Sequence, residues 1–211
     1  IANLTLIPPR CGPDRMESVQ GWDCGPANSL IDLAVSRFTN GQQAFDQGGS
    51  MAAAGRSRED WIQQWLSHPY LLSAPPKSTG REQFGSNDLD QRLQNLQGVE
   101  PCDVVATLTA FSAAVIAQDL QQLGQRTGIR PLELIVAGGG RHNPVLMREL
   151  KTRCHGLRVR SSDAIGLPAE AREALVFALL AWWHHRQHPG NAPAITGAAR
   201  ETILGCLVRP E

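Results

Sequence analysis

Short apolar runs alternate with longer amphipathic segments along the chain, and the short runs predict strands. Residues 1–7 alternate apolar and polar positions before a pair of prolines, which indicates a strand with an abrupt end. Residues 132–137 form a short apolar run that is typical of a buried strand, and a further strand is expected at 157–159. Residues 10–21 are rich in turn formers and are predicted to form a loop.

Helices are predicted where apolar side chains recur every three or four residues. The strongest stripe runs through residues 102–123, and a pair of glycines at 48–49 breaks the chain between two amphipathic segments. The segments expected to be helical are residues 27–38, 58–67, 88–96, 102–123, 144–154 and 168–185. Because helices alternate with a few strands, the pattern favours the α/β class.

Composition narrows the class of protein further. Of the 211 residues 42% are hydrophobic, which supports a packed globular core, and Lys plus Arg equals Asp plus Glu at 20 each. This balance provides no basic surplus for nucleic acid or acidic lipid, so neither is an expected partner. The five cysteines are scattered and form no CxxC pair, which favours reduced thiols in a cytoplasmic protein. The sequence has no uninterrupted run of about 18 apolar residues, so no membrane-spanning helix is expected.

The chain opens with Ile1-Ala2-Asn3, without a starting Met or a signal-peptide pattern, and it enters an expected strand at once. We therefore expect the sequence to be a fragment whose upstream part is absent.

The first candidate for chemistry is Asp23, in the segment Gly-Trp-Asp-Cys-Gly-Pro-Ala-Asn at residues 21–28. A carboxylate between glycines, just before a helix, lies near exposed backbone N–H groups. Aspartate is also common at such places as a helix cap or a turn former. The octapeptide alone leaves both interpretations open.

The second candidate is the turn Gly138-Gly139-Gly140, which follows an expected strand and precedes an expected helix. Three glycines let a ligand approach the backbone closely, and a helix N-terminus suits phosphate. The turn is neither a GxGxxG nor a Walker A sequence, and a simple tight connection fits it equally well.

A third segment, residues 75–82, gathers Lys77, Ser78, Thr79 and Arg81 in one loop. These groups suit a phosphate or a polar sugar, although a solvated loop is the more ordinary interpretation. Glu173, at the start of the last long helix, suits sugar hydroxyls or simply complements the helix dipole.

Two other kinds of site are disfavoured by the motifs. The six histidines show no HExxH or Cys/His spacing, so no protein-held metal centre is expected. No Gly-x-Ser-x-Gly sequence is present, which disfavours a serine hydrolase.

Taken in chain order, six segments resemble motifs of one family, the anhydro-N-acetylmuramic acid kinases. They are residues 1–5, which resemble the end of a Gly-Gly-Ile-Ala-Asn segment; residues 21–28, which resemble Gly-x-Asp-Thr-Gly-Pro-Gly-Asn; residues 76–82, which match Pro-Lys-Ser-Thr-Gly-Arg-Glu; residues 136–144, which match Cys-Gly-Gly-Gly-x-x-Asn-Pro; and residues 173–178 and 189–198. The resemblance covers essentially the whole chain.

The chain departs from the family pattern at a few positions. Cys24 replaces a usual Thr, Ala27 a usual Gly, and Glu170 a frequent Asp. The family's N-terminal Gly-Thr-Ser-x-Asp-Gly phosphate-binding hairpin and the two glycines before Ile1 are not in this chain.

The resemblance implies an actin-like fold of the sugar kinase and Hsp70 (ribonuclease H-like) type. This chain would supply mostly the second lobe, with helices returning to the first. Residues 1–125 would form a sugar-side and helical segment, and residues 126–211 a nucleotide-side segment.

The implied reaction opens 1,6-anhydro-N-acetylmuramic acid with water and phosphorylates it from ATP with Mg²⁺, giving N-acetylmuramic acid 6-phosphate in peptidoglycan recycling. Asp23 would be the catalytic base. The cofactor-binding residues would be Gly138, Gly139, Gly140 and Asn143, and the sugar-binding residues Glu173, Asn28, Lys77, Ser78, Thr79 and Arg81. A homodimer is a further expectation.

Two other classes of function remain open. An inactive fragment or a non-catalytic module would bind nucleotide or sugar without turnover. A sugar-responsive repressor on the same fold would need a helix-turn-helix, which the sequence does not show.

Overall fold

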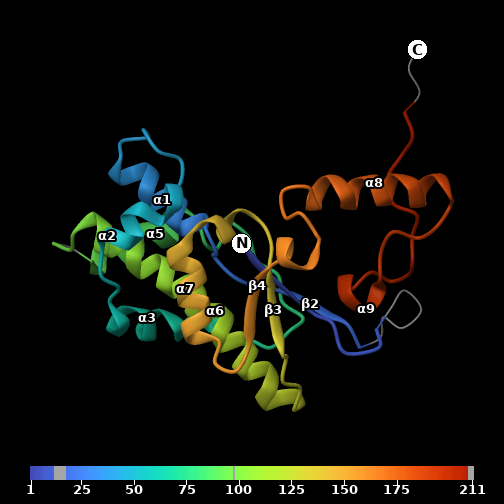
Figure 1. Cartoon of the computed structure of the whole chain (residues 1–211), viewed down its shortest axis with the longest axis horizontal. Coiled ribbons are helices and arrows are strands. Elements are labelled where there is room, and N and C mark those ends of the chain that lie inside the picture. The colour runs from blue at the N-terminus through green and yellow to red at the C-terminus, as the bar shows by residue number, and fades with distance from the viewer. Residues whose placement is uncertain (12–17, 97, 209–211) are drawn as a thin grey trace. The chain divides into compact units, whose positions relative to one another are not determined.

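The computed structural model describes residues 1–11, 18–96 and 98–208. The chain has an α/β fold in which helices predominate (Figure 1). Contacts group the chain into a first unit, Ile1–Leu4 with Trp22–Ser161, and a second unit, Thr5–Gly21 with Ser162–Glu211. The main elements are β1 (Ala2–Leu6), β2 (Gln20–Gly25), α1 (Ser29–Phe38), α2 (Ser50–Ala54), α3 (Glu59–Leu66), α4 (Pro69–Leu72), α5 (Ser86–Asn95), α6 (Pro101–Thr127), β3 (Glu133–Val136), α7 (Pro144–Arg153), β4 (Arg158–Ser161), α8 (Arg172–His185) and α9 (Pro193–Thr196). The predicted α/β class is confirmed.

The core of the first unit is built around α6. Its predicted apolar stripe is buried, with Val105 and Phe111 at 0% exposure, and it packs against α1, α2, α3 and α7. By length and hydropathy alone α6 could cross a bilayer, which the sequence analysis did not anticipate. Because 67% of its most apolar window is buried in the fold, it has the character of a core helix.

The segment from β3 to β4 is a β–α–β unit. β3 and β4 pair in parallel, with Leu134 opposite Val159, and α7 forms the crossover between them. The apolar face of α7 contributes Leu146 and Leu150 to a cluster that also includes Ala113 of α6. The predicted strands and helix here are confirmed, and β4 begins at Arg158, one residue later than expected.

The structure corrects three predictions about local structure. Residues 20–25 form β2, which pairs with β1, whereas the sequence analysis placed a loop and a turn there. Two short helices, α2 and α4, form in segments where the sequence analysis expected no helix. Residues 12–17 of the predicted loop lie outside the described residues.

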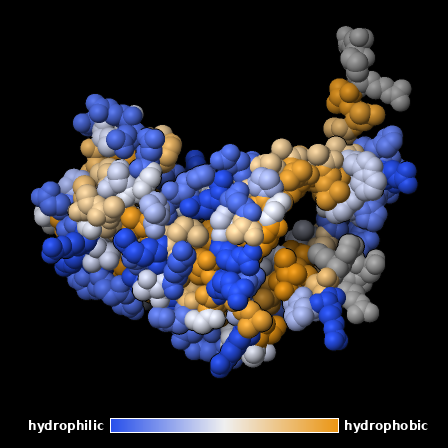
Figure 2. Space-filling model, in the orientation of Figure 1, coloured by the Kyte–Doolittle hydropathy of each residue, from blue (hydrophilic) through white to orange (hydrophobic). Residues whose placement is uncertain are grey.

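The second unit contains α8, which was predicted to begin at residue 168. Residues 169–171 form a turn instead, and the helix begins at Arg172. No residue of α8 is buried, although most of its side chains are apolar. Phe177 is 68% exposed, and Figure 2 shows hydrophobic residues gathered on the surface over the start of this helix. The contact-defined units do not divide the chain at residue 125, so the proposed lobe boundary stays a prediction.

Candidate active site

Asp23 lies in the middle of β2, where successive side chains point to opposite faces of the strand. Its neighbours Trp22 and Cys24 are buried, with 5% and 0% of their surfaces exposed. Asp23 is only half-buried. The alternation of β2 therefore directs the carboxylate away from the core that holds its two neighbours.

Three groups donate hydrogen bonds to the Asp23 carboxylate. The Nδ2 of Asn3 donates to Oδ1, while the Ser78 hydroxyl and the Thr79 backbone N–H each donate to Oδ2 over 2.9 Å. These donors come from β1 and from the loop after Pro76, none of them from α1, so the structure removes the helix-cap interpretation. A carboxylate offers about four acceptor positions. The described donors leave one of them, on Oδ1, for a ligand.

The backbone of Asp23 is fixed as firmly as its side chain. Its N–H donates to the Lys77 carbonyl over 3.1 Å, and the Tyr70 hydroxyl donates to the Asp23 carbonyl over 2.8 Å. Burial, followed by the nearby negative charge of Asp23, raises the pKa of the Tyr70 phenol well above its usual range, so the hydroxyl stays protonated as a donor. The strand and the loop at 77–79 thus form one rigid support.

Lys77, in this loop, also forms a buried ion pair. Lys77 Nζ is 2.9 Å from Asp119 Oδ1, and the two side chains are 4% and 2% exposed. The indole N–H of Trp22 donates to the other Asp119 oxygen over 2.9 Å. Burial and then the Asp119 charge raise the pKa of the Cys24 thiol, which stays neutral. Lys77 was predicted to bind substrate, but its ammonium group is directed into the interior.

The connection from β2 to α1 approaches the glycine turn. Ala27 has a φ of 47°, in the left-handed region that glycine adopts readily, which explains why glycine is usual at the matching position of the family that the sequence resembles. The side chain of Asn28 makes no capping hydrogen bond. Instead, a Cβ added at Gly140 would lie 3.4 Å from Asn28 Oδ1. The segment containing Asp23 and the triple-glycine turn therefore meet at Asn28.

The triple-glycine turn presents open backbone. Gly138 has a φ of 87°, and a Cβ added at Gly138 or Gly139 would meet nothing within 4 Å. A short 3₁₀ turn (Gly139–His142) follows, and Asn143 caps α7 by accepting from the N–H groups of Val145 and Leu146. A helix N-terminus behind glycines with open backbone, of which Gly139 is exposed, fits an anionic ligand such as a nucleotide phosphate. The cap gives the Asn143 side chain a structural role in addition to any contact with a ligand.

The remaining predicted side chains of the first unit line the loop after Lys77. Ser78 and Arg81 are exposed, and the Thr79 hydroxyl is directed to Gln83 Oε1 at 2.7 Å. Burial raises the pKa of Asp32, in the first turn of α1, to about 6, although the positive charge of Arg81 acts in the opposite direction. Arg81 is thus electrostatically coupled to the helix that follows Asn28.

Glu173 belongs to the second unit. It lies in the first turn of α8 and is exposed to solvent. Its proposed contact with the sugar stays a prediction. Across the described residues, no three His, Cys, Asp or Glu side chains gather in a way that would hold a metal ion.

Three residues that support Asp23 were not singled out from the sequence: Asn3, Tyr70 and Asp119. Asn3 and Tyr70 are 20 and 47 positions from Asp23, and no local pattern connects them. A signal did exist for Asp119, because it interrupts the apolar stripe of α6 beside Ile116 and Leu120. A carboxylate at such a position needs a buried partner.

A fixed carboxylate with one acceptor position left by the described donors, on a segment that touches an open glycine turn, suits an enzyme that acts on a ligand carrying phosphate. The sequence profile of the anhydro-N-acetylmuramic acid kinases matches residues 1–210. The chain therefore belongs to this family.

Curated relatives agree with the profile. The chain is 69% identical over 211 residues to an anhydro-N-acetylmuramic acid kinase of Synechococcus sp. (strain CC9902), and 68% identical over 210 residues to that of Parasynechococcus marenigrum (strain WH8102). A relative from Prochlorococcus marinus (strain MIT 9211) is 54% identical over 210 residues. All of this chain is covered in each case, but only 55–56% of each relative. The chain spans about half the length of these relatives.

Proposed function

We propose that the protein containing this chain is an ATP-dependent kinase that opens 1,6-anhydro-N-acetylmuramic acid and phosphorylates it to N-acetylmuramic acid 6-phosphate. The observation that carries the proposal is the Asp23 carboxylate, held by Asn3, Ser78 and Thr79 with one acceptor position left on Oδ1. The names of the relatives support the choice of sugar and of a kinase reaction.

The free acceptor position on Asp23 suits a general base. In the proposed reaction Asp23 takes a proton from water, and the water oxygen bonds to the anomeric carbon of the sugar. The bond from that carbon to the bridging oxygen breaks, and the released oxygen attacks the γ-phosphorus of ATP with ADP as the leaving group. A positioned base contributes about 10²–10⁴-fold to the rate. The hydrogen bonds to the Asp23 backbone and side chain provide the positioning.

The triple-glycine turn is the proposed nucleotide site. Gly138 and Gly139 leave room for the phosphates to approach the backbone, and the Asn143-capped N-terminus of α7 favours their negative charge. Asn28 lies beside Gly140 and belongs to the same segment as Asp23, so it connects this turn to the proposed base. Mg²⁺ bound with ATP would neutralise negative charge on the phosphates. Such an ion is typically held by one or two carboxylates together with the phosphates.

The proposed sugar contacts come from Ser78, Thr79, Arg81 and Glu173. The exposed hydroxyl of Ser78 already bonds the catalytic carboxylate, so it lies within reach of the reacting group. Lys77 takes a different role in this proposal: its carbonyl holds the Asp23 backbone, while its ammonium group pairs with Asp119.

For the whole protein we propose the two-lobed actin-like fold, cytoplasmic localisation and a homodimer, with small molecules as its substrates. The uncovered apolar side chains of α8 suit a helix that packs against a further part of such a kinase. The balanced charge of the chain supports the expectation that neither nucleic acid nor a membrane is a partner.

A phosphotransfer assay tests this function. The full-length protein is incubated with ATP, Mg²⁺ and 1,6-anhydro-N-acetylmuramic acid, and the product is identified by mass and by phosphorus NMR. We expect a 6-phosphate of the opened sugar and stoichiometric ADP. Nucleotide and sugar binding without any product would instead support the alternative of a non-catalytic module. The chain of residues 1–211, assayed in parallel, shows whether this portion turns over alone.

A further inference from the structure

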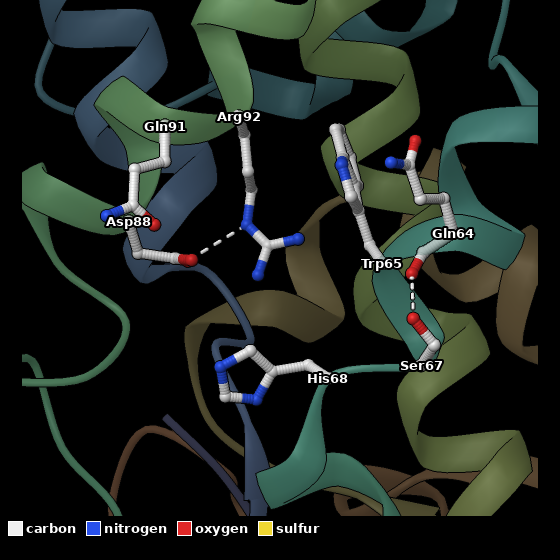
Figure 3. Close-up of a pocket in the computed structure, with 7 residues that line it drawn as sticks. All are labelled: Gln64, Trp65, Ser67, His68, Asp88, Gln91 and Arg92. Atoms are coloured by element: carbon white, nitrogen blue, oxygen red, sulfur yellow. Dashed lines mark hydrogen bonds and ion pairs between the residues drawn. The ribbon is translucent and has the colours of Figure 1, made fainter.

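A second polar pocket lies in the first unit, among residues that the proposed reaction does not use. The cavity has a volume of about 260 Å³ and lies between α3, the residue that caps α4, and α5. Figure 3 shows the side chains that line it, with Arg92 and Trp65 facing one another and His68 beside them. The pocket is smaller than most sites for drug-sized ligands, which measure about 300–1,000 Å³.

Arg92 is buried at this pocket in an unusually fixed position. Its side chain is only 6% exposed, and its Nε donates to Asp88 Oδ2 over 2.9 Å. The guanidinium carbon lies 4.9 Å from the ring centre of Trp65 and 4.7 Å from that of Phe111. The aromatic rings and Asp88 set the plane and the orientation of the guanidinium group.

The terminal nitrogens of Arg92 have no acceptor among the described residues. Of its five N–H groups, only the Nε–H donates a hydrogen bond to another described residue. In Figure 3 these nitrogens are directed toward the space between Trp65 and His68. No terminal nitrogen of Arg92 is among the fully buried described atoms that lack a partner, so solvent or a ligand can reach these nitrogens. The pocket therefore contains a preorganised hydrogen-bonding fork that opens to solvent.

Further donors surround that fork. The indole N–H of Trp65 is buried and has no acceptor in the described part of the chain. His68 Nδ1 accepts a hydrogen bond from the Tyr70 N–H over 3.2 Å, so in the neutral ring the proton is on Nε2. Gln64 and Gln91, both exposed, line the mouth and offer adaptable amides.

We propose that this pocket binds a small anion through a carboxylate or phosphate group, held by the terminal nitrogens of Arg92. The planar fork of a guanidinium group matches both chemistries in a bidentate manner. A cavity of about 260 Å³ accepts the anionic group with a few further atoms, not a nucleotide. The site is separate from Asp23, although its wall residue His68 caps α4, the helix that carries Tyr70 to the Asp23 carbonyl.

The test follows the Arg92 side-chain resonances of the full-length protein by nitrogen–proton NMR. Inorganic phosphate and acetate are titrated separately at constant ionic strength, with chloride as the replaced anion. We expect saturable shifts of the Arg92 signals with at least one of the two probes, and the responsive probe identifies whether phosphate or carboxylate is preferred. An absence of saturable shifts with both probes overturns the proposal.

Charge changes at the pocket mouth separate this site from any other anion site. Gln91→Glu retains Arg92 and the size of the side chain, and we expect it to weaken binding of the responsive probe about tenfold, while Gln91→Lys strengthens it. Arg37→Lys is the matched control. It alters the exposed ion pair between Arg37 of α1 and Asp90 of α5, which do not line the pocket, and it is expected to leave the dissociation constant of the probe unchanged. An unchanged dissociation constant in Gln91→Glu means that the anion binds elsewhere and contradicts the proposal.

Discussion

Replacing Lys77 by Met tests whether the buried ion pair holds the candidate active site together. The Nζ of Lys77 lies 2.9 Å from Asp119 Oδ1, and the side chains are 4% and 2% exposed. Met has a similar length without the charge, so Asp119 keeps its hydrogen bond from Trp22 but loses its cationic partner. Breaking a buried pair by removing one partner costs about 3–5 kcal/mol, because the other charge stays buried without compensation. We expect the free energy of unfolding to fall by this amount.

The assay is urea unfolding followed by tryptophan fluorescence. Arg37→Met is the matched control, because Arg37 and Asp90 form an ion pair at 2.6 Å with side chains 42% and 50% exposed. Its loss is expected to cost less than about 1 kcal/mol. The double variant Lys77→Met, Asp119→Asn removes both buried charges and keeps an acceptor for Trp22. It is expected to be more stable than Lys77→Met alone, by about 1 kcal/mol or more.

Two results would refute this reasoning. One is a loss in Lys77→Met no larger than the loss in the Arg37→Met control. For the other, the single variant Asp119→Asn is measured as well. A double variant whose destabilisation equals the sum of the losses in Lys77→Met and Asp119→Asn would mean that Lys77 and Asp119 are not energetically coupled.

Three further predictions follow from burial and backbone geometry. Iodoacetamide at pH 8 should modify the exposed Cys206 and spare Cys24, whose thiol pKa is raised by burial, as measured by mass spectrometry. The pKa of Asp32 is about 6 in the fold and about 4 in unfolded chains, so the folded state binds the extra proton and stability falls as the pH rises from 4 to 6. Urea unfolding of Asp32→Asn should lack this loss of about 1–2 kcal/mol. Gly49→Ala should lower the melting temperature more than Gly48→Ala, since both have positive φ but only the Gly49 Cβ would lie 2.4 Å from the amide oxygen that caps α7.

The sequence predicted the helices well because their signal is local. The stripe of α6 and the Pro144 start of α7 follow from helical periodicity and from proline at the first turn. β2 was missed because it contains Gly21 and Gly25, and two glycines in so short a segment favour a turn over a strand. Its strand character depends on pairing with β1, which no local pattern encodes.

The site was predictable in part for the same reason. Residue type and spacing made Asp23 and the triple-glycine turn candidates only, and the resemblance to the kinase family favoured them. The structure brings their segments together at Asn28, while their roles stay predictions. The role of Lys77 was not predictable, because its direction depends on a carboxylate that lies 42 positions away on α6. A lysine in a polar loop is usually solvated, and only the fold shows that this one is buried.

Single-turnover kinetics of the Asp23→Asn variant of the full-length protein test the central claim most directly. The amide retains the shape of the carboxylate but cannot accept the proton of the attacking water. We predict that ATP and the anhydro sugar still bind, with dissociation constants close to those of the wild type, while the rate of phosphorylated product falls by about 10²-fold or more. A rate within about tenfold of the wild type, with binding unchanged, would contradict the assignment of Asp23 as the base.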